Sequence, residues 1–269
     1  MNTTNQIFSW HRYTAALRKE LVERRYLLLL LVGLMFLFFL ALFYFPYSYS
    51  LETARMRKFF FIVYGFAGFS VIVPSLAFSQ LTSKTGRVGM FSLPTSMFEK
   101  YAVGVTIYII GFIVAFAVCV QLADWVRYYI LLKQEGTTNT LVESVKMAAT
   151  TRSLTWGYPR SEWSYSSWTI YAAYAPVFLM GSVLWPRWSV LKTAVAMTAL
   201  GLVESFVIYF TVGFLGGGKL DWGSVQYNQQ YLAMDDVINI ILLVGSFVLG
   251  WYMFKRKDII SLKWWKQNN

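Results

Sequence analysis

The sequence predicts an all-α integral membrane protein: six transmembrane helices, an N-terminal interfacial amphipathic helix, and both termini in the cytoplasm. Three observations support this fold class. The 269-residue chain is 57% hydrophobic and only 14% charged, whereas soluble domains contain about 25% charged residues. Its hydrophobic residues form continuous runs of about 20 residues, which is the length of a helix that crosses a bilayer. Its cations concentrate in the polar segments between these runs.

Residues 1–25 form a polar and basic arm. Within it, Trp10, Tyr13, Leu17 and Leu21 recur at helical spacing with cations between them. This pattern is typical of a helix that lies on a membrane surface, so we expect an interfacial helix on the cytoplasmic leaflet. The apolar run that follows lacks a small-residue cleavage motif, and we therefore expect it to be an uncleaved first span.

Six apolar segments qualify as spans within a transmembrane domain of residues 26–254. Their continuous rather than alternating hydrophobicity favours helices over the strands of a barrel. The expected spans are residues 26–45, 59–80, 101–123, 168–185, 193–216 and 237–254. Pro74 predicts a kink in the second span.

The distribution of lysine and arginine orients these spans. With the N-terminus inside, most of the 24 cations lie in the arm, the loop 81–100, the connection before the fifth span and the basic tail 255–269, as the positive-inside rule requires. The external loop 124–167 is long, so its charges matter less. Three cations at 55–58 lie on the outer side, where we expect them to reach the interface; a flipped topology is the alternative.

Composition excludes several classes of function. Cys119 is the only cysteine and His11 the only histidine. Cysteine zinc sites, HExxH metalloprotease sites and histidine-based triads are therefore excluded within one chain, and we expect neither a metal nor a cofactor. Cationic loops that face an anionic leaflet account for the net charge of +11, so we expect no nucleic-acid partner.

The segment GFLGGGKL, Gly213–Leu220, has the glycine and lysine spacing of a phosphate-binding loop but lacks its last residue. Leu220 stands where a Ser or Thr would hold magnesium. The segment also ends an apolar run on the predicted outer side, so we expect a glycine turn that ends or breaks the fifth helix. We therefore expect no intrinsic ATPase activity and no other catalytic site.

Glu204 is the one acidic residue well inside a predicted span. A carboxyl group there is costly unless it is paired or hydrated, so Glu204 is a candidate for the translocation path or a proton site. A polar contact between helices is the alternative. Asp235 and Asp236 precede the sixth span, where a helix cap explains them better than a metal or acid–base pair.

The loop 81–100, between the second and third spans, ends in SLPTSMFEKY. Pro94 suits the first turn of a helix with Ser92 as its cap, so we expect a short docking helix over 92–101 and a tether over 81–90. A merely solvated loop is the alternative. The residues expected to couple this helix to a partner, through an apolar face and a charged rim, are Leu93, Pro94, Ser96, Met97, Phe98, Glu99 and Lys100.

The order of these elements resembles the membrane subunit of ATP-binding-cassette (ABC) exporters of the type 2 permease family. Two short motifs add to the resemblance, the segment 93–101 and RWSVLKT at 187–193, which are similar to stretches in permeases from Bacteroidetes-like bacteria. Thr95 departs from the small alanine expected at its position. The resemblance implies a multi-pass permease subunit of a bacterial inner (plasma) membrane. It also implies two partners, a separate ATPase subunit and a second permease subunit in a homodimer or heterodimer.

On this resemblance, the arm is the connecting helix and the loop 81–100 holds a coupling helix that docks in a groove of the ATPase. The fifth span, broken near 213–218, would supply re-entrant helices at the outer mouth. The alternative function is a non-transporting membrane anchor, sensor or assembly factor that docks through its cationic arm and tail. If the chain were an intramembrane enzyme, Asp235 and Asp236 would be its best candidate catalytic residues. Lipid, peptide, drug-like and polysaccharide substrates all remain open.

Overall fold

A computed structural model describes residues 8–44, 51–92, 94–134, 163–215 and 229–256. Every regular element within these residues is a helix, so the all-α prediction is confirmed for this part of the chain. The long helices, of 20 to 27 residues, are α2 (Arg25–Tyr44), α3 (Leu51–Ser75), α6 (Phe112–Gln134), α8 (Trp163–Leu184), α9 (Ser189–Leu215) and α11 (Gln229–Lys255). The shorter elements are α1 (Trp10–Glu23), the 3₁₀ turn η1 (Ser79–Thr82), α4 (Lys84–Phe91), α5 (Met97–Val105) and the π-helical turn η2 (Thr106–Gly111).

Three helical stretches of the described residues are long and apolar enough to cross a membrane: Arg25–Phe43, Met97–Arg127 and Val237–Lys255. They coincide with the first, third and sixth predicted spans, and by length and composition they make this chain a membrane protein. The other predicted spans fall on α3, α8 and α9. Among the described side chains of those helices, the apolar stretches are shorter: Phe60–Ser75, Tyr174–Leu184 and Ser189–Val203.

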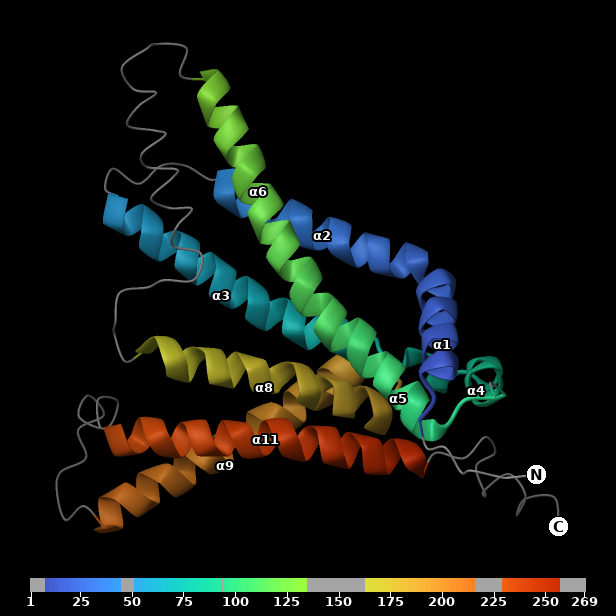
Figure 1. Cartoon of the computed structure of the whole chain (residues 1–269). Coiled ribbons are helices and arrows are strands. Elements are labelled where there is room, and N and C mark those ends of the chain that lie inside the picture. Colours follow the sequence, from blue (N-terminus) through green and yellow to red (C-terminus); the bar gives the residue numbers. More distant parts are fainter. Residues whose placement is uncertain (1–7, 45–50, 93, 135–162, 216–228, 257–269) are drawn as a thin grey trace.

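The long helices converge at one end of the structure and spread apart toward the other (Figure 1). α8 packs against α3, α9 and α11, while α2 packs against α6 and α3. The start of α2, the end of α3, the start of α5, the end of α8, the start of α9 and the end of α11 gather at the end that also holds α1 and α4. We call this the α1 end. It holds the contacts from which the candidate site is built.

An aromatic cluster holds α2, α3 and α6 together. Phe116 of α6 makes edge-to-face contacts with Phe39 of α2, at 5.2 Å between ring centroids, and with Phe66 of α3, at 5.1 Å. Such geometry places the positive edge of one ring on the negative face of another. Gly65 allows the approach, because a Cβ at this position would lie 2.6 Å from the Phe39 ring.

The polar loop after α3 contains two regular elements, η1 and α4. The expected tether contains a helix of its own, α4, whose N-cap is Ser83. The Ser83 hydroxyl accepts a hydrogen bond from the backbone N–H of Gly86 at 3.0 Å, so one free donor of the helix start is satisfied. The segment 81–90, expected to be a tether, therefore contains most of a short helix, α4.

The helix that follows also begins later than expected. Ser92 is the C-cap of α4 rather than the N-cap of a new helix, and α5 begins at Met97 with Ser96 as its N-cap. From there the chain continues through η2 into α6. The expected docking helix over 92–101 is thus two different structures, a turn followed by the first turn of a spanning stretch.

Candidate functional site

The first turn of α5 contains a reciprocal pair of capping hydrogen bonds. The Ser96 hydroxyl accepts a hydrogen bond from the Glu99 N–H at 3.1 Å, and Glu99 Oε2 accepts one from the Ser96 N–H at 2.8 Å. This capping box satisfies two of the donors that a helix start leaves unpaired. The Glu99 side chain is fully buried, and the two capping hydrogen bonds fix its orientation.

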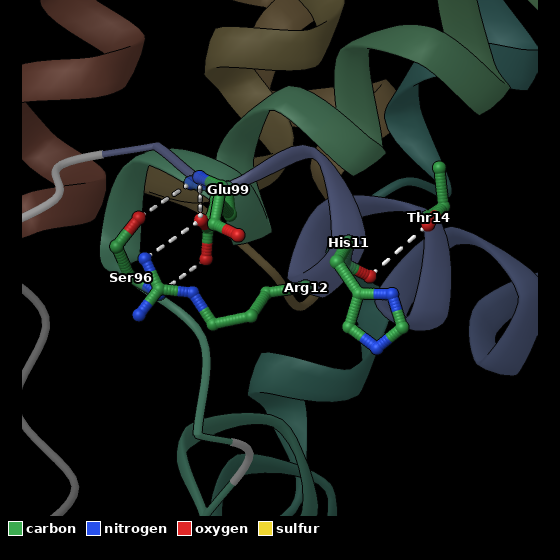
Figure 2. A network of polar contacts seen from close by, with 6 residues as sticks. His11, Arg12, Thr14, Ser96 and Glu99 are labelled. Atoms are coloured by element: carbon green, nitrogen blue, oxygen red, sulfur yellow. Dashed lines mark hydrogen bonds and ion pairs between the residues drawn. The ribbon is translucent and has the colours of Figure 1, made fainter.

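The second oxygen of Glu99 binds the N-terminal arm. Glu99 Oε1 accepts hydrogen bonds from the backbone N–H of Ser9 at 2.7 Å and from Nη2 of Arg12 at 3.1 Å (Figure 2). Ser9 is the N-cap position of α1, and its own side chain makes no capping bond. One carboxylate of α5 therefore joins the start of α1 to the start of a membrane-spanning stretch.

Lys100 binds the end of α4. Its side chain is buried, and its Nζ donates a hydrogen bond at 3.2 Å to the backbone carbonyl of Phe91, the last residue of α4. The same ammonium group lies 5.7 Å from the centre of the Phe91 ring. A cation at a helix C-terminus meets unpaired carbonyl groups and the negative end of the helix dipole, so Lys100 holds the last turn of α4 against α5.

Tyr101 binds α11. Its hydroxyl donates a hydrogen bond at 3.2 Å to the carbonyl of Phe247. Gly250 gives that hydroxyl its space, because a Cβ at position 250 would lie 2.6 Å from it. The Tyr101 ring stacks nearly parallel to that of Phe78 at 5.8 Å and lies at the same distance from Phe254.

Three consecutive residues thus bind three different elements: Glu99 binds α1, Lys100 binds α4 and Tyr101 binds α11. We call these residues the α5 junction. Successive residues of a helix point about 100° apart, so one turn of α5 can contact three neighbouring elements in three directions. The arrangement fixes the start of the stretch Met97–Arg127 relative to everything around it at the α1 end.

A second buried network surrounds Arg24, the residue between α1 and α2. Its Nε pairs with Glu20 at 2.6 Å, and its Nη1 donates to the carbonyl of Leu76 at 3.0 Å and to the hydroxyl of Tyr108 at 2.7 Å. The planar guanidinium group suits such divergent hydrogen bonds. One side chain therefore connects the α1–α2 corner to the end of α3 and to η2.

The neighbourhood of Arg24 changes the acidity of Glu20. Burial raises the pKa of Glu20 above its ordinary value of 4.5, and the positive charge of Arg24 opposes that rise. In the amide orientation that satisfies its neighbours, the side-chain oxygen of Gln80 accepts hydrogen bonds from Nε and Nη2 of Arg24 at 3.0 and 2.9 Å. Arg24, Glu20 and Gln80 together link α1 to η1.

Both ends of α1 contact the π-helical turn η2. Tyr13 shares a hydrogen bond of 2.6 Å with Thr106, and Arg24 holds Tyr108 two residues further on. A π-helical turn carries one residue more than an α-helical turn, and such turns occur frequently at functional sites. The position of α1 is therefore tied to the one irregular turn in the stretch Met97–Arg127.

α4 offers an exposed surface at the α1 end. Val88 is 54% exposed, and Lys84 and Thr85 are exposed beside it. Pro94 and Phe98, which follow α4 in the chain, are exposed as well. Figure 1 shows α4 outside the body of long helices. The exposed side of α4 thus carries the apolar Val88 and the cation Lys84, which lie one helical turn apart.

The residues expected at a docking surface fall into two groups in the structure. Pro94 and Phe98 are exposed, and Ser96 and Met97 are partly buried. Glu99 and Lys100 are buried and bind other elements of the same chain, so neither forms a charged rim in this structure. Leu93 lies outside the described residues.

The other candidates lie partly or wholly outside the described side chains. Glu204 lies in α9, but its side chain is not among those described. The same is true of Asp235 and Asp236 in α11, and the glycines at 216–218 lie outside the described residues. Among the described residues, no group of three or more histidine, cysteine or acidic side chains could hold a metal ion.

Sequence reasoning missed Ser9, Arg12, Arg24 and Tyr108 as members of these networks. The capping box itself has a sequence signature, Ser96 followed three residues later by Glu99. Glu20 lies at the i,i+4 spacing of a helical ion pair with Arg24, but Leu76 and Tyr108 have no such signature, because they lie 52 and 84 positions away in the chain.

Comparisons with known protein families, with curated proteins and with solved structures find no match to this chain.

Proposed function

We propose that this chain is the membrane-spanning permease subunit of an ATP-binding-cassette exporter in a bacterial inner membrane. ATP hydrolysis would take place in a separate subunit, and a second permease subunit would complete the path. One observation carries the proposal. α4 is a short helix outside the body of long helices (Figure 1). Its start adjoins η1, the turn that follows α3, and its end is held by Lys100 of the stretch Met97–Arg127. This arrangement suits a lever driven by another protein.

The proposal includes six transmembrane helices with both termini in the cytoplasm. The long helices have 20 to 27 residues, and about 20 residues cross the hydrocarbon core. Charge supports the orientation, because cytoplasmic segments carry an excess of lysine and arginine. The described basic residues at the α1 end are Arg12, Arg18, Lys19, Arg24, Arg25, Lys84, Arg87, Lys100, Arg187, Lys192, Lys255 and Arg256, whereas those at the other end lie at positions 55, 57, 58, 127 and 133.

The route of coupling follows the contacts of α4. At its start, α4 adjoins η1, which continues from α3. At its end, the Lys100 hydrogen bond attaches it to α5 and hence to α6. A movement imposed on α4 therefore reaches the second and third predicted spans together. Closure of an ATPase dimer could tilt these helices and change access to the path.

The docking surface in this proposal is the exposed face of α4 with Pro94 and Phe98. Glu99 and Lys100 act through the α5 junction as positioning residues, since both are buried in this chain. Glu204 in α9 is the proposed contact with substrate in the translocation path. The charge of a glutamate within a spanning helix is costly unless water or a partner meets it.

The proposal is tested by substitution of Val88 on the exposed face of α4. With the ATPase partner co-purified, Val88→Glu should abolish the stimulation of ATP hydrolysis by the permease without loss of membrane insertion. A buried carboxylate at an apolar contact is unfavourable. Val88→Thr, which is nearly the same shape, is the control and should retain at least half of the stimulation.

Two results would overturn the proposal. Unchanged stimulation in Val88→Glu would exclude α4 as the docking element. ATP hydrolysis by the purified chain alone would contradict an ATPase in a separate subunit. If purification from native membranes recovers no ATPase, the alternative of a non-transporting anchor, sensor or assembly factor is supported instead.

A further inference from the structure

One side of α1 is covered by the protein and the other is exposed. Tyr13 and Ala16 are buried, and Arg24 and Glu20 take part in the network at the α1–α2 corner. This corrects part of the sequence prediction, because Tyr13 belongs to the stripe expected to lie on the leaflet. Its hydroxyl instead binds Thr106 of η2.

The exposed side of α1 combines apolar and basic side chains. We call it the outer arc of α1, and its members are Trp10, His11, Thr14, Ala15, Arg18, Leu21 and Val22. At about 100° per residue these positions cover roughly 140° of the helix. Trp10, Leu21 and Val22 are 69%, 43% and 57% exposed, and His11, Arg18 and Val22 line an open hollow on this side. Arg18 thus lies in the middle of an apolar surface.

The position of α1 relative to the bilayer follows from the chain. α2, a membrane-spanning stretch, begins at Arg25, one residue after the C-cap of α1. Figure 1 shows that α1 turns away from the axis of α2 instead of continuing it. The end of α1 is therefore held at the level where α2 enters the membrane, which is the level of the lipid headgroups.

We propose that the outer arc of α1 binds the headgroups of anionic phospholipids, with Arg18 on the phosphate and with Trp10, Leu21 and Val22 in the interfacial layer. No acidic residue lies within the outer arc. Glu23, which follows Val22 in the chain, pairs with Lys19 at 3.5 Å. Apolar side chains on both sides of a cation fit a lipid better than a free phosphate ion, because interfacial binding combines buried apolar area with attraction to anionic headgroups.

The inference does not depend on an ATPase partner, so the two proposals can fail separately. It has a structural consequence at the α5 junction. The inner side of α1 carries Arg12 and Tyr13, which bind Glu99 and Thr106. A lipid that holds the outer arc would therefore hold α1 against α5 and η2.

The immersion of the outer arc can be measured with spin labels on the whole chain. In a Cys119→Ala background, single cysteines at Val22 and Val88 provide matched positions, 57% and 54% exposed, one on the outer arc and one on α4. In nanodiscs of phosphatidylglycerol, the label at position 22 should be more accessible to oxygen than to a water-soluble nickel chelate. The label at position 88 should show the reverse. Equal, water-like accessibility at both positions would overturn the proposal.

Lipid selectivity is tested by retention of added phosphatidylglycerol and phosphatidylcholine on the detergent-purified chain, measured by native mass spectrometry. Arg18→Gln should reduce retention of phosphatidylglycerol about fivefold. A basic residue near an anionic surface contributes about 1 kcal/mol, which corresponds to this factor. Lys84→Gln, at an exposed cation of α4, is the control and should not change retention. Equal retention of both lipids, no effect of Arg18→Gln, or displacement of the lipid by millimolar inorganic phosphate would contradict the proposal.

Discussion

The carboxylate of Glu99 accepts a hydrogen bond of 2.7 Å from the backbone N–H of Ser9, which lies 90 positions earlier in the chain. The N-terminal arm is therefore attached directly to the first turn of a membrane-spanning stretch. Because Glu99 also closes the capping box of α5, one side chain sets both the start of a helix and the position of its neighbour. A loss of this carboxylate should affect both.

Glu99→Ala should lower the free energy of unfolding by roughly 2–4 kcal/mol. The substitution leaves the backbone N–H groups of Ser9 and Ser96 without their acceptors, and each buried donor without a partner costs about 1–3 kcal/mol. It also leaves Arg12 without its carboxylate. Reversible unfolding in mixed micelles measures the change.

Glu23→Ala is the matched control for that measurement. Glu23 is 48% exposed and lies 3.5 Å from Lys19 within one helix. A surface pair of this kind contributes less than about 1 kcal/mol. If Glu23→Ala destabilises the protein as much as Glu99→Ala does, the α5 junction has no special role in stability.

Gly250→Ala should destabilise the protein by about 1–3 kcal/mol, and Tyr101→Phe should relieve most of that cost. An alanine Cβ would lie 2.6 Å from the Tyr101 hydroxyl, and overpacking of a core has a cost of this size. Without the hydroxyl oxygen, the nearest atoms would be at 3.5 Å, an ordinary contact distance. A double-mutant cycle on unfolding free energies should therefore give an interaction of at least about 1 kcal/mol.

Gly245→Ala tests whether the effect is specific to position 250. Gly245 lies in the same helix, and a Cβ there would have no other atom within 4 Å. Alanine is also the better helix former. The variant should be as stable as the wild-type protein or slightly more stable. Equal losses at positions 245 and 250 would mean that helix contacts with Tyr101 do not determine the cost.

Arg24→Lys should destabilise the protein by about 2–3 kcal/mol, whereas Arg25→Lys should change stability by less than about 0.5 kcal/mol. Arg24 is buried, and its guanidinium group binds Glu20, Leu76 and Tyr108 at the same time. An ammonium group lacks the planar fork that reaches all three. Arg25 is exposed, stacks on Tyr26 and donates an exposed hydrogen bond to the Tyr26 hydroxyl at 3.1 Å. Similar effects at the two positions would show that the network around Arg24 is not important for stability.

The sequence was most informative where composition alone determines structure. Long apolar runs must be helical in a bilayer, because every backbone polar group needs a partner within its own segment. The predicted spans consequently fall on helices of the structure, and the first, third and sixth coincide with stretches long and apolar enough to cross a membrane. The presence of α1 was also predictable, from its apolar residues at helical spacing.

The candidate site was less predictable for two physical reasons. α4 contains Gly86 and Gly89, which lower helix propensity, and its stability comes from the Ser83 cap and from Lys100 at its end. The distinction between cations that face the protein and those that face outward depends on tertiary contacts. Glu20, four residues before Arg24, is the one local feature that separates the buried Arg24 from the exposed Arg25, and it does not predict the contacts with Leu76 and Tyr108.

Chemical crosslinking from Lys84 shows whether α4 docks a separate ATPase. Lys84 is the exposed lysine at the start of α4. The tagged chain is treated with an amine-reactive crosslinker in native membranes, and crosslinked peptides are identified by mass spectrometry. If α4 docks the ATPase, Lys84 should be crosslinked to an ATP-binding-cassette ATPase, and the crosslink should be lost in Lys84→Arg. Crosslinks from Lys84 to other proteins, without any ATPase among them, would contradict this docking.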